Sequence, residues 1–356
     1  MLSRVADSIY WMARYVERAE NLSRLLLSTQ DLLLDAGAEG RLDESQFWQP
    51  ILATTGDEEA YAAVHKKIKG RDVADFLALR PENPNSILNC IRAARENART
   101  VRDQISDELW ECLNGLKLFV ESAEGKSTYR NQSAAFYERV LRRSYQFQGI
   151  ADSTTPRGEV WHFLRLGTCL ERADQMSRLL DTCSDLSREM APHPEARPLR
   201  WAALLRSCSA WHAFQAHSSR LDPHKIIEYL LLDETFPRSI ACCITEVHRA
   251  LRELGGTGAL SDMSTPVRHS GRLRADLAYS TVDELTTKGL HEFVDELQLR
   301  LGQIGQSIFE TFVLYPDVQL EEEPLHAAAH LGAFHAHTAE EDAQVQQQQQ
   351  QQQQQQ

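Results

Sequence analysis

The chain has 356 residues, of which 42% are hydrophobic and 8% aromatic, a composition typical of a globular protein that can bury a sizeable core. Acidic residues (51) outnumber basic ones (38), so the net charge is -13 and we expect no nucleic-acid partner. No stretch approaches 18 uncharged apolar residues, and Arg4, Asp7 and Arg14 interrupt the apolar pattern at the N-terminus. We therefore expect neither a signal peptide nor a membrane-spanning helix, and predict a cytoplasmic protein with no membrane partner.

Helical periodicity dominates the sequence. Residues 3–34 place apolar side chains on one broad face of a helix and charged or polar side chains on the other. The apolar face holds Val5, Ile9, Met12, Tyr15, Val16, Ala19, Leu22 and Leu26, and the polar face holds Arg14, Glu17, Glu20, Asn21 and Arg24. Further helical patterns cover residues 45–79, 103–115, 129–149, 157–189, 201–232 and 264–314. No alternating β-branched run is present, so the sequence predicts an all-α fold, a helical bundle.

Prolines mark several boundaries along the chain. The pairs Asn83-Pro84 and Phe236-Pro237 are each predicted to open a helix, because proline at the first helical position loses no hydrogen bond. Thr155-Pro156, inside the segment 152–158, is expected to break any helix that crosses it. Pro192, Pro194 and Pro198 indicate an internal connection and not a domain boundary.

Two parts of the sequence resemble each other. Residues 17–26 (ERAENLSRLL) return as residues 171–180 (ERADQMSRLL) with seven of ten letters identical, and residues 48–91 match 201–244 at 11 of 44 positions. The second match includes a Pro-x-Ser-Ile-x-x-Cys-Ile block that starts at Pro84 and again at Pro237. We infer an internal duplication of a unit of about 150 residues. Copy one would span residues 1–152 and copy two 153–316, related by a pseudo-two-fold axis within one integrated domain.

The cysteines and the C-terminal segment indicate no metal centre. Seven cysteines without a Cys-x-x-Cys pair are typical of reduced, buried thiols. Residues 317–356 are acidic, then rich in alanine and histidine, and end in eleven glutamines, which predicts a disordered tail. Histidines in this tail lack a cysteine or a second shell, and His291 with Glu292 and Asp295 resembles a metal-binding helix only superficially. We therefore expect no bound metal.

The repeated Glu-Arg pairs, Glu17-Arg18 and Glu171-Arg172, are the main candidates for function. Adjacent residues point about 100° apart on a helix, so the two members of a pair must find partners elsewhere. Glu17 falls near Arg14 and Arg24 on a face that looks exposed, whereas Arg18 falls at the edge of the apolar face.

Three interpretations of these pairs are open. In the first, the copies exchange partners, Glu17 with Arg172 and Glu171 with Arg18, and this fixes the register of two long helices. In the second, the four residues line a groove that binds a carboxylate or phosphate together with Arg14, Arg24 and Arg178. In the third, they form a solvated surface array. The sequence identifies no catalytic residue.

Four blocks resemble the bacterial alpha-E family, helical proteins with a Glu-Arg motif. They are MLSRVADSIYWMARYVERAENLSRLL, NPNSILNCIRAARENARTVRDQIS, GEVWHFLRLGTCLERADQMSRLL and FPRSI, which occur in this order within residues 1 to about 315. The resemblance implies a protein encoded beside, or fused to, a circularly permuted ATP-grasp ligase, often with a transglutaminase-like protein nearby. The family's motif maps onto Glu17-Arg18 and Glu171-Arg172. The poly-Gln tail departs from the family pattern.

These observations together give a functional hypothesis. The chain lacks a phosphate-cradling glycine loop after a strand and an evident carboxylate pair for magnesium, so we expect ATP and Mg on the partner and no cofactor on this chain. The resemblance then implies the non-ATP-binding subunit of a system that forms amide or peptide bonds, with arginines that hold a carboxylate substrate. The alternatives are an independent helical enzyme acting on peptide or amide bonds at the Glu-Arg groove, and a scaffold without a site.

Overall fold

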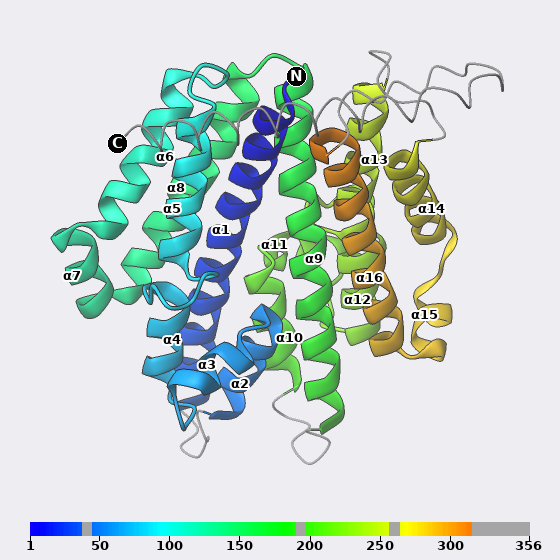
Figure 1. The fold of residues 1–356 in the computed structure, drawn as a ribbon. Helices are drawn as coiled ribbons and strands as arrows, with labels where there is room; N and C mark the ends of the chain where they lie inside the picture. The colour runs from blue at the N-terminus through cyan, green and yellow to red at the C-terminus, as the bar shows by residue number, and fades with distance from the viewer. Residues whose placement is uncertain (38–44, 190–196, 256–263, 315–356) are drawn as a thin grey trace, which may run out of the picture. The chain divides into compact units, whose positions relative to one another are not determined.

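A computed structural model describes residues 1–37, 45–189, 197–255 and 264–314, and the predicted all-α fold is confirmed. Within these ranges there are sixteen α-helices, one short π-helix and no β-strand (Figure 1). The elements in chain order are α1 (Ser3–Gly37), α2 (Ser45–Thr55), α3 (Glu58–Val64), α4 (Gly70–Ala78), α5 (Ile87–Thr100), α6 (Asp107–Glu121), α7 (Ala123–Asn131), α8 (Ser133–Thr154), α9 (Glu159–Glu189), α10 (Arg197–Ser207), α11 (Trp211–His217), α12 (Pro223–Leu232), α13 (Ile240–Leu254), α14 (Thr265–Tyr279), α15 (Val282–Lys288), α16 (Leu290–Phe309) and η3 (Glu310–Leu314).

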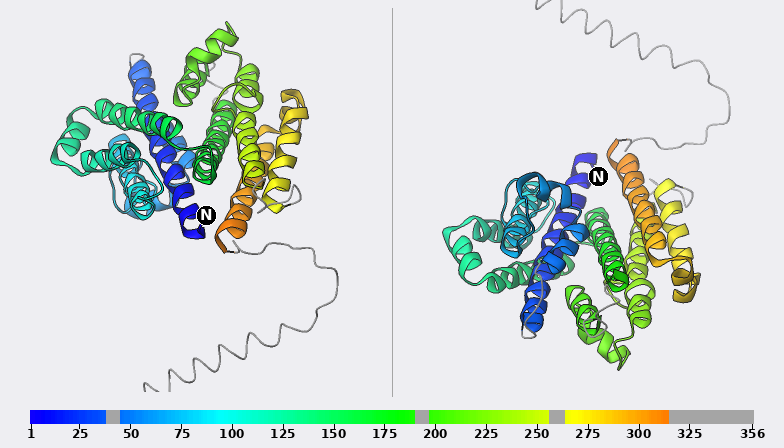
Figure 2. Two further views of the ribbon diagram at one scale, coloured as in Figure 1. Left: turned by 90° about the horizontal axis from the view of Figure 1, so that it is seen from above. Right: turned by 90° about the horizontal axis from the view of Figure 1, so that it is seen from below.

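The two longest helices, α1 and α9, lie side by side in the middle of the bundle (Figures 1 and 2). Helix α1 also packs against α5, α8 and α10, and α9 packs against α13, α16 and α2. Gly167 of α9 allows the close approach of the two central helices, because a Cβ atom at this position would lie 2.3 Å from the carbonyl oxygen of Tyr10. The polar residues of α1 therefore face other helices on nearly every side.

Several of the predicted long helices are divided in the structure. The 45–79 pattern forms α2, α3 and α4, and the 201–232 pattern forms α10, α11 and α12. Gly56 follows α2 with a φ of +70°, a left-handed conformation that suits glycine and cannot continue a helix. Ser209 has a φ of +54° between α10 and α11. Apolar periodicity persists across such single-residue breaks, so the pattern alone could not locate them.

The prediction that Pro84 and Pro237 open helices is wrong in position. Helices α5 and α13 begin three residues later, at Ile87 and Ile240. Ser86 and Ser239 cap them, since each side chain accepts a hydrogen bond from a backbone N–H in the first turn. The serine satisfies an otherwise unpaired helix donor, which the proline cannot do, and the proline belongs to the preceding turn.

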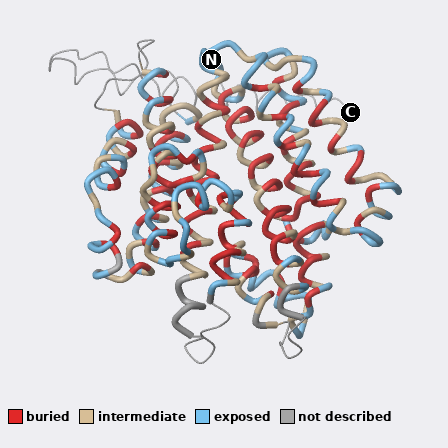
Figure 3. Tube along the Cα trace, turned by 180° about the vertical axis from the view of Figure 1, so that it is seen from behind, coloured by how far each residue is buried: buried red, intermediate tan, exposed pale blue. Residues whose placement is uncertain are grey.

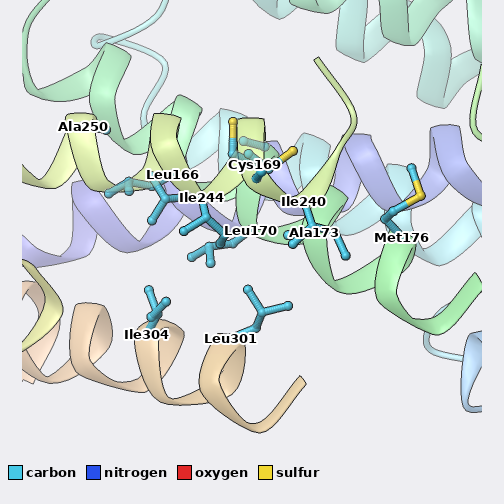
Figure 4. Packing of buried hydrophobic residues seen from close by; sticks show 14 of the residues in the cluster. Leu166, Cys169, Leu170, Ala173, Met176, Ile240, Ile244, Ala250, Leu301 and Ile304 are labelled. Carbon is cyan, nitrogen blue, oxygen red and sulfur yellow. The ribbon is translucent and has the colours of Figure 1, made fainter. Parts of the chain in front are cut away.

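Buried side chains form two hydrophobic clusters, and the buried positions recur along the inner sides of the helices (Figure 3). The smaller cluster joins the second half of α1 to helices α2 to α8. In the larger one, α9 packs against α13 and α16 (Figure 4). Its central residues include Leu166, Leu170 and Ala173 of α9, Ile240 and Ile244 of α13, and Leu301 and Ile304 of α16. The seven cysteines form no disulfide within the described residues, and five of them are buried, as predicted.

The described residues all belong to one compact unit. Helix α8 ends at Thr154 and α9 begins at Glu159, so the chain leaves the helical conformation at Thr155-Pro156, as predicted. The internal duplication and the boundary between two copies stay predictions. The predicted disordered tail and most of the proline-rich connection lie outside the described residues. No helix in the described ranges is long and apolar enough to cross a bilayer.

Candidate functional site

Two buried carboxylates, Glu17 on α1 and Glu171 on α9, lie where the central helices meet. Glu171 accepts hydrogen bonds from Arg14 (Nε–Oε2, 2.8 Å) and Arg18 (Nε–Oε1, 2.7 Å). Glu17 accepts one from Arg172, with an Nε–Oε1 distance of 2.9 Å. The exchange of Glu17 with Arg172 and of Glu171 with Arg18, proposed from the sequence as the first interpretation, is therefore present.

Helix geometry brings these side chains together. Arg14 and Arg18 are four residues apart on α1, so they lie on the same side of the helix and both reach Glu171. Two N–H groups of Arg18 contact the carboxylate, because Nη2 also lies 3.1 Å from Oε2. This fork-like contact fixes orientation as well as charge.

The face of α1 that looks exposed in the sequence is buried, and that expectation is wrong. Glu17 and Glu20 are 1% and 0% exposed, and Arg24 is 4% exposed. Arg24 bonds to Glu20 (Nη1–Oε1, 2.8 Å) and to the Ser207 carbonyl oxygen (2.6 Å). Helices α8 and α10 cover this face, so a polar stripe lies inside the bundle because other helices supply its partners. The third interpretation, a solvated array, does not fit these exposures.

Arg238 and Gln148 complete the network around Glu17, and the sequence reasoning missed both. Arg238 donates to Glu17 (Nη1–Oε1, 2.7 Å) and also pairs with Glu20. Gln148 on α8 donates to Glu17 and Glu20 and accepts from Arg172 at 2.8 Å. Nothing in the 129–149 pattern distinguishes Gln148 from a surface glutamine, since its role depends on the packing of α8.

Asn85 has the corresponding place beside Glu171. It accepts from Arg18 (Nη1–Oδ1, 2.9 Å) and donates to the buried Asp57 (Nδ2–Oδ1, 3.2 Å). Asn85 and Arg238 are the variable second residues of the two Pro-x-Ser-Ile blocks. Their matching positions in the two blocks could have identified them as members of the network. The loop before α5 and the loop before α13 each place one polar side chain beside a Glu-Arg pair.

The network holds both glutamates in their charged form. Burial by itself would raise the pKa of Glu171, but Arg14 and Arg18 outweigh it and lower this pKa to about 2. Burial likewise opposes ionisation of Glu17, whose pKa is lowered to about 2 by Arg172 and Arg238. The glutamates in turn raise the pKa of Arg14, Arg18 and Arg172 against the effect of burial.

These pKa values predict an acid-labile fold. Because the folded-state pKa of Glu171 lies below the ordinary value of 4.5, its ionisation stabilises the fold fully above about pH 4.5, and this contribution disappears as the pH falls to about 2. The pKa difference corresponds to a contribution on the order of 3 kcal/mol. Urea denaturation between pH 7 and pH 2 should show stability falling steeply below pH 4.5. A flat profile over that window would contradict the assignment.

Arg14 and Arg178 differ from the other candidates because they line a cleft of about 490 Å³ between α1, α9 and α16. Two carboxylates, Asp7 and Asp174, share this cleft with them. Arg178 pairs with Asp174, with an Nε–Oδ2 distance of 3.1 Å. The apolar lining includes Trp11, Phe163, Leu170, Leu301, Ile308 and Phe309.

The seven candidate residues therefore separate into two groups. Glu17, Arg24, Glu171 and Arg172 are buried, and Arg18 contributes both its Nε and its Nη2 to Glu171. None of these five is among the residues that line the cleft. The groove of the second interpretation is represented by Arg14 and Arg178 alone, with acidic neighbours that were not predicted.

Asp181, His291 and Asp295 come within 4.8 Å of one another, close enough to be considered as metal ligands. His291 Nδ1 lies 2.7 Å from Asp181 Oδ1, and its Nε2 lies 3.6 Å from Asp295 Oδ2. The two ring nitrogens thus face different carboxylates, an arrangement that suits a polar link between α9 and α16.

Comparison with known proteins places the chain in a family. It is 25% identical over 316 residues to uncharacterised proteins of Mycobacterium bovis and Mycobacterium tuberculosis. The matched region covers 83% of this chain but 34% of each relative, so the chain spans about a third of the length of these relatives. No solved structure matches the chain. The Alpha-E family, described as a predicted alpha-helical domain with a conserved ER motif, matches residues 1–313. The chain, with its two Glu-Arg pairs at the contact of α1 and α9, therefore belongs to the Alpha-E family.

Proposed function

We propose that this chain is the non-ATP-binding helical subunit of an ATP-grasp-dependent system that forms amide or peptide bonds. In this proposal the cleft at Arg14 and Arg178 holds an amino acid or the end of a peptide. The observation that carries the proposal is the mixture of two guanidinium groups and two carboxylates on an apolar wall. A free amino acid or peptide end offers a carboxylate, an ammonium group and often an apolar side chain, so its chemistry complements each part of this lining.

Arg14 and Arg178 each keep N–H groups that could donate hydrogen bonds to such a ligand. Arg14 contacts Glu171 through Nε and Tyr10 through Nη1, and its Nη2 has no hydrogen-bond partner among the described residues. Arg178 contacts Asp174 through Nε and Nη2, which leaves its Nη1 group to donate to a carboxylate. Burial raises the pKa of Asp7, one of the two carboxylic acids that line this cleft. The Glu-Arg network positions Arg14, and the cleft binds the substrate.

ATP and Mg would reside on the partner. A circularly permuted ATP-grasp protein, implied by the family resemblance, would activate a carboxylate, and a transglutaminase-like protein would act in the same system. The mycobacterial relatives have about two thirds of their length outside the matched region, which leaves room for a fused partner. Such an arrangement supports a role that requires a second catalytic unit.

Arg178→Met, assayed with a co-expressed ATP-grasp partner, tests the cleft. We expect amide formation by the pair and by neither protein alone. The variant should lower kcat/KM roughly 10- to 150-fold, because a hydrogen bond to a charged group contributes about 1.5–3 kcal/mol. Its melting temperature should change little, since a partly exposed i,i+4 ion pair contributes about 0.5 kcal/mol.

Arg142→Met is the matched control, because Arg142 forms an exposed i,i+4 pair with Glu138 on α8. It should leave both activity and stability unchanged. Turnover by the chain alone would favour the independent enzyme. Full activity of Arg178→Met in the pair would favour a scaffold, an alternative that the burial of the Glu-Arg network also supports.

A further inference from the structure

A second cleft, of about 670 Å³, is lined by residues from α1, α2, α4, α7 and α8 and shares no lining residue with the first. Four cationic side chains line it: Arg71, Arg80, Lys126 and Arg130. This concentration of positive charge stands out in a chain whose net charge is -13. It is a local feature that composition alone conceals.

The fold brings these cations together from separate places in the sequence. Arg71 is in the first turn of α4 and Arg80 follows the end of that helix. Lys126 and Arg130 are four residues apart on α7, so they project from the same side. Two helices that are distant in the sequence thus present their basic residues to one space.

The four cations are available for a ligand. Among the residues that the structure describes, none of them forms an ion pair, whereas Arg139 and Arg92 nearby are paired with Glu124 and Glu121. The lining includes one carboxylate, Asp75, whose Oδ1 already accepts a hydrogen bond from Tyr129 at 2.7 Å. The cleft therefore has a local excess of three positive charges.

A buried donor in the same lining points independently to a ligand. Trp48 is 4% exposed, and its indole N–H has no hydrogen-bond partner in the described part of the chain. A buried polar group without a partner costs about 1–3 kcal/mol, so it is usually satisfied by another polar group, by water or by a ligand. Trp48 also lines the cleft, where an anionic oxygen would accept from it.

We propose that this cleft binds a small ligand that carries phosphate groups with a total charge of about -2 to -3. A single carboxylate would neutralise a third of the excess charge, whereas a phosphate monoester or a diphosphate matches it. Guanidinium forks and a lysine ammonium are the side chains that recognise phosphate oxygens. The volume lies within the range of about 300–1,000 Å³ that is typical of small-molecule sites.

Isothermal titration of the full chain with pyrophosphate at constant ionic strength tests the proposal. We expect saturable binding that weakens at least tenfold in the double variant Arg71→Gln/Arg130→Gln. Trp48→Phe, which removes the indole N–H together with part of the ring volume and keeps an aromatic side chain, should also weaken it. The matched control is Arg268→Gln/Arg272→Gln, because both residues are exposed on α14 and remove the same charge; it should bind as the unaltered chain does.

Three outcomes would overturn the proposal. They are an absence of saturable pyrophosphate binding, equal loss of affinity in the control, and citrate binding as tightly as pyrophosphate. The last would show that charge alone is recognised. Titration with inorganic phosphate distinguishes a site for one phosphate from a site for two: equal affinity assigns a phosphate monoester, and weaker affinity assigns a diphosphate. None of these results depends on the activity of the Arg14 and Arg178 cleft.

Discussion

Replacing Glu171 with glutamine is expected to lower the free energy of unfolding by about 3–5 kcal/mol, because breaking a buried ion pair from one side leaves the other charge uncompensated. Glu171 is 0% exposed and is the carboxylate that both Arg14 and Arg18 contact. Glutamine keeps the shape of the side chain but presents an N–H group to one guanidinium. Urea denaturation followed by circular dichroism measures the loss.

Glu138→Gln is the appropriate control, since Glu138 forms an exposed pair with Arg142 and should change the stability by less than about 0.5 kcal/mol. Equal effects of the two substitutions would show that solvent screens the network. If Glu171→Gln is too unstable to purify, Arg18→Met offers a milder measurement, because its side chain is 20% exposed and Arg14 would still neutralise Glu171. Stability unchanged in that variant would contradict the proposed strength of the network.

Gly167→Ala is expected to destabilise the fold by about 3 kcal/mol, at the upper end of the usual range for overpacking. The added Cβ would lie 2.3 Å from the backbone oxygen of Tyr10 and 3.0 Å from the Cβ of Ala13. A backbone oxygen within a helix cannot move aside as a side chain can, so α1 and α9 would have to separate. Thermal and urea denaturation both report this loss.

Gly149→Ala on α8 is expected to stabilise the fold, in contrast to Gly167→Ala. Apart from the nearby backbone of its own helix, no atom lies within 4 Å of a Cβ built at this exposed position, so alanine should stabilise the helix by up to about 1 kcal/mol. The comparison separates helix propensity from helix contact, because both variants make the same chemical change. Stabilisation by both substitutions would mean that α1 and α9 do not approach closely at Gly167.

Helix geometry predicted that the members of each Glu-Arg pair have their partners elsewhere, and the exchange between the two pairs was one of three interpretations that the sequence left open. Neighbouring positions diverge by about 100°, so Glu17 and Arg18 had to be paired outside their own pair. The burial of the polar face of α1 could not be predicted in this way. An amphipathic pattern predicts that the polar side of a helix meets water, whereas Glu20 and Arg24 meet Arg238 and Ser207.

The remaining differences have similarly local causes. Helices α5 and α13 start later than predicted because Ser86 and Ser239, and not the prolines, stand next to their first turns as caps. Of the predicted groove residues, Arg14 and Arg178 line a cleft, but Asp7 and Asp174 could not be added without knowing that α16 closes it. The sequences of α1 and α9 do not show that α16 forms the third wall of the cleft.

The long sequence separations within the Glu-Arg network have a consequence for synthesis on the ribosome. Glu171 is 157 residues downstream of Arg14, and Arg238 is 221 residues downstream of Glu17. At typical translation speeds, roughly 10 to 40 s pass between the emergence of Glu17 and that of Arg238. Throughout this interval the charged side chains of α1 lack some of the partners that they have in the folded chain. The central contact of the bundle therefore closes late, after most of the polypeptide has left the exit tunnel.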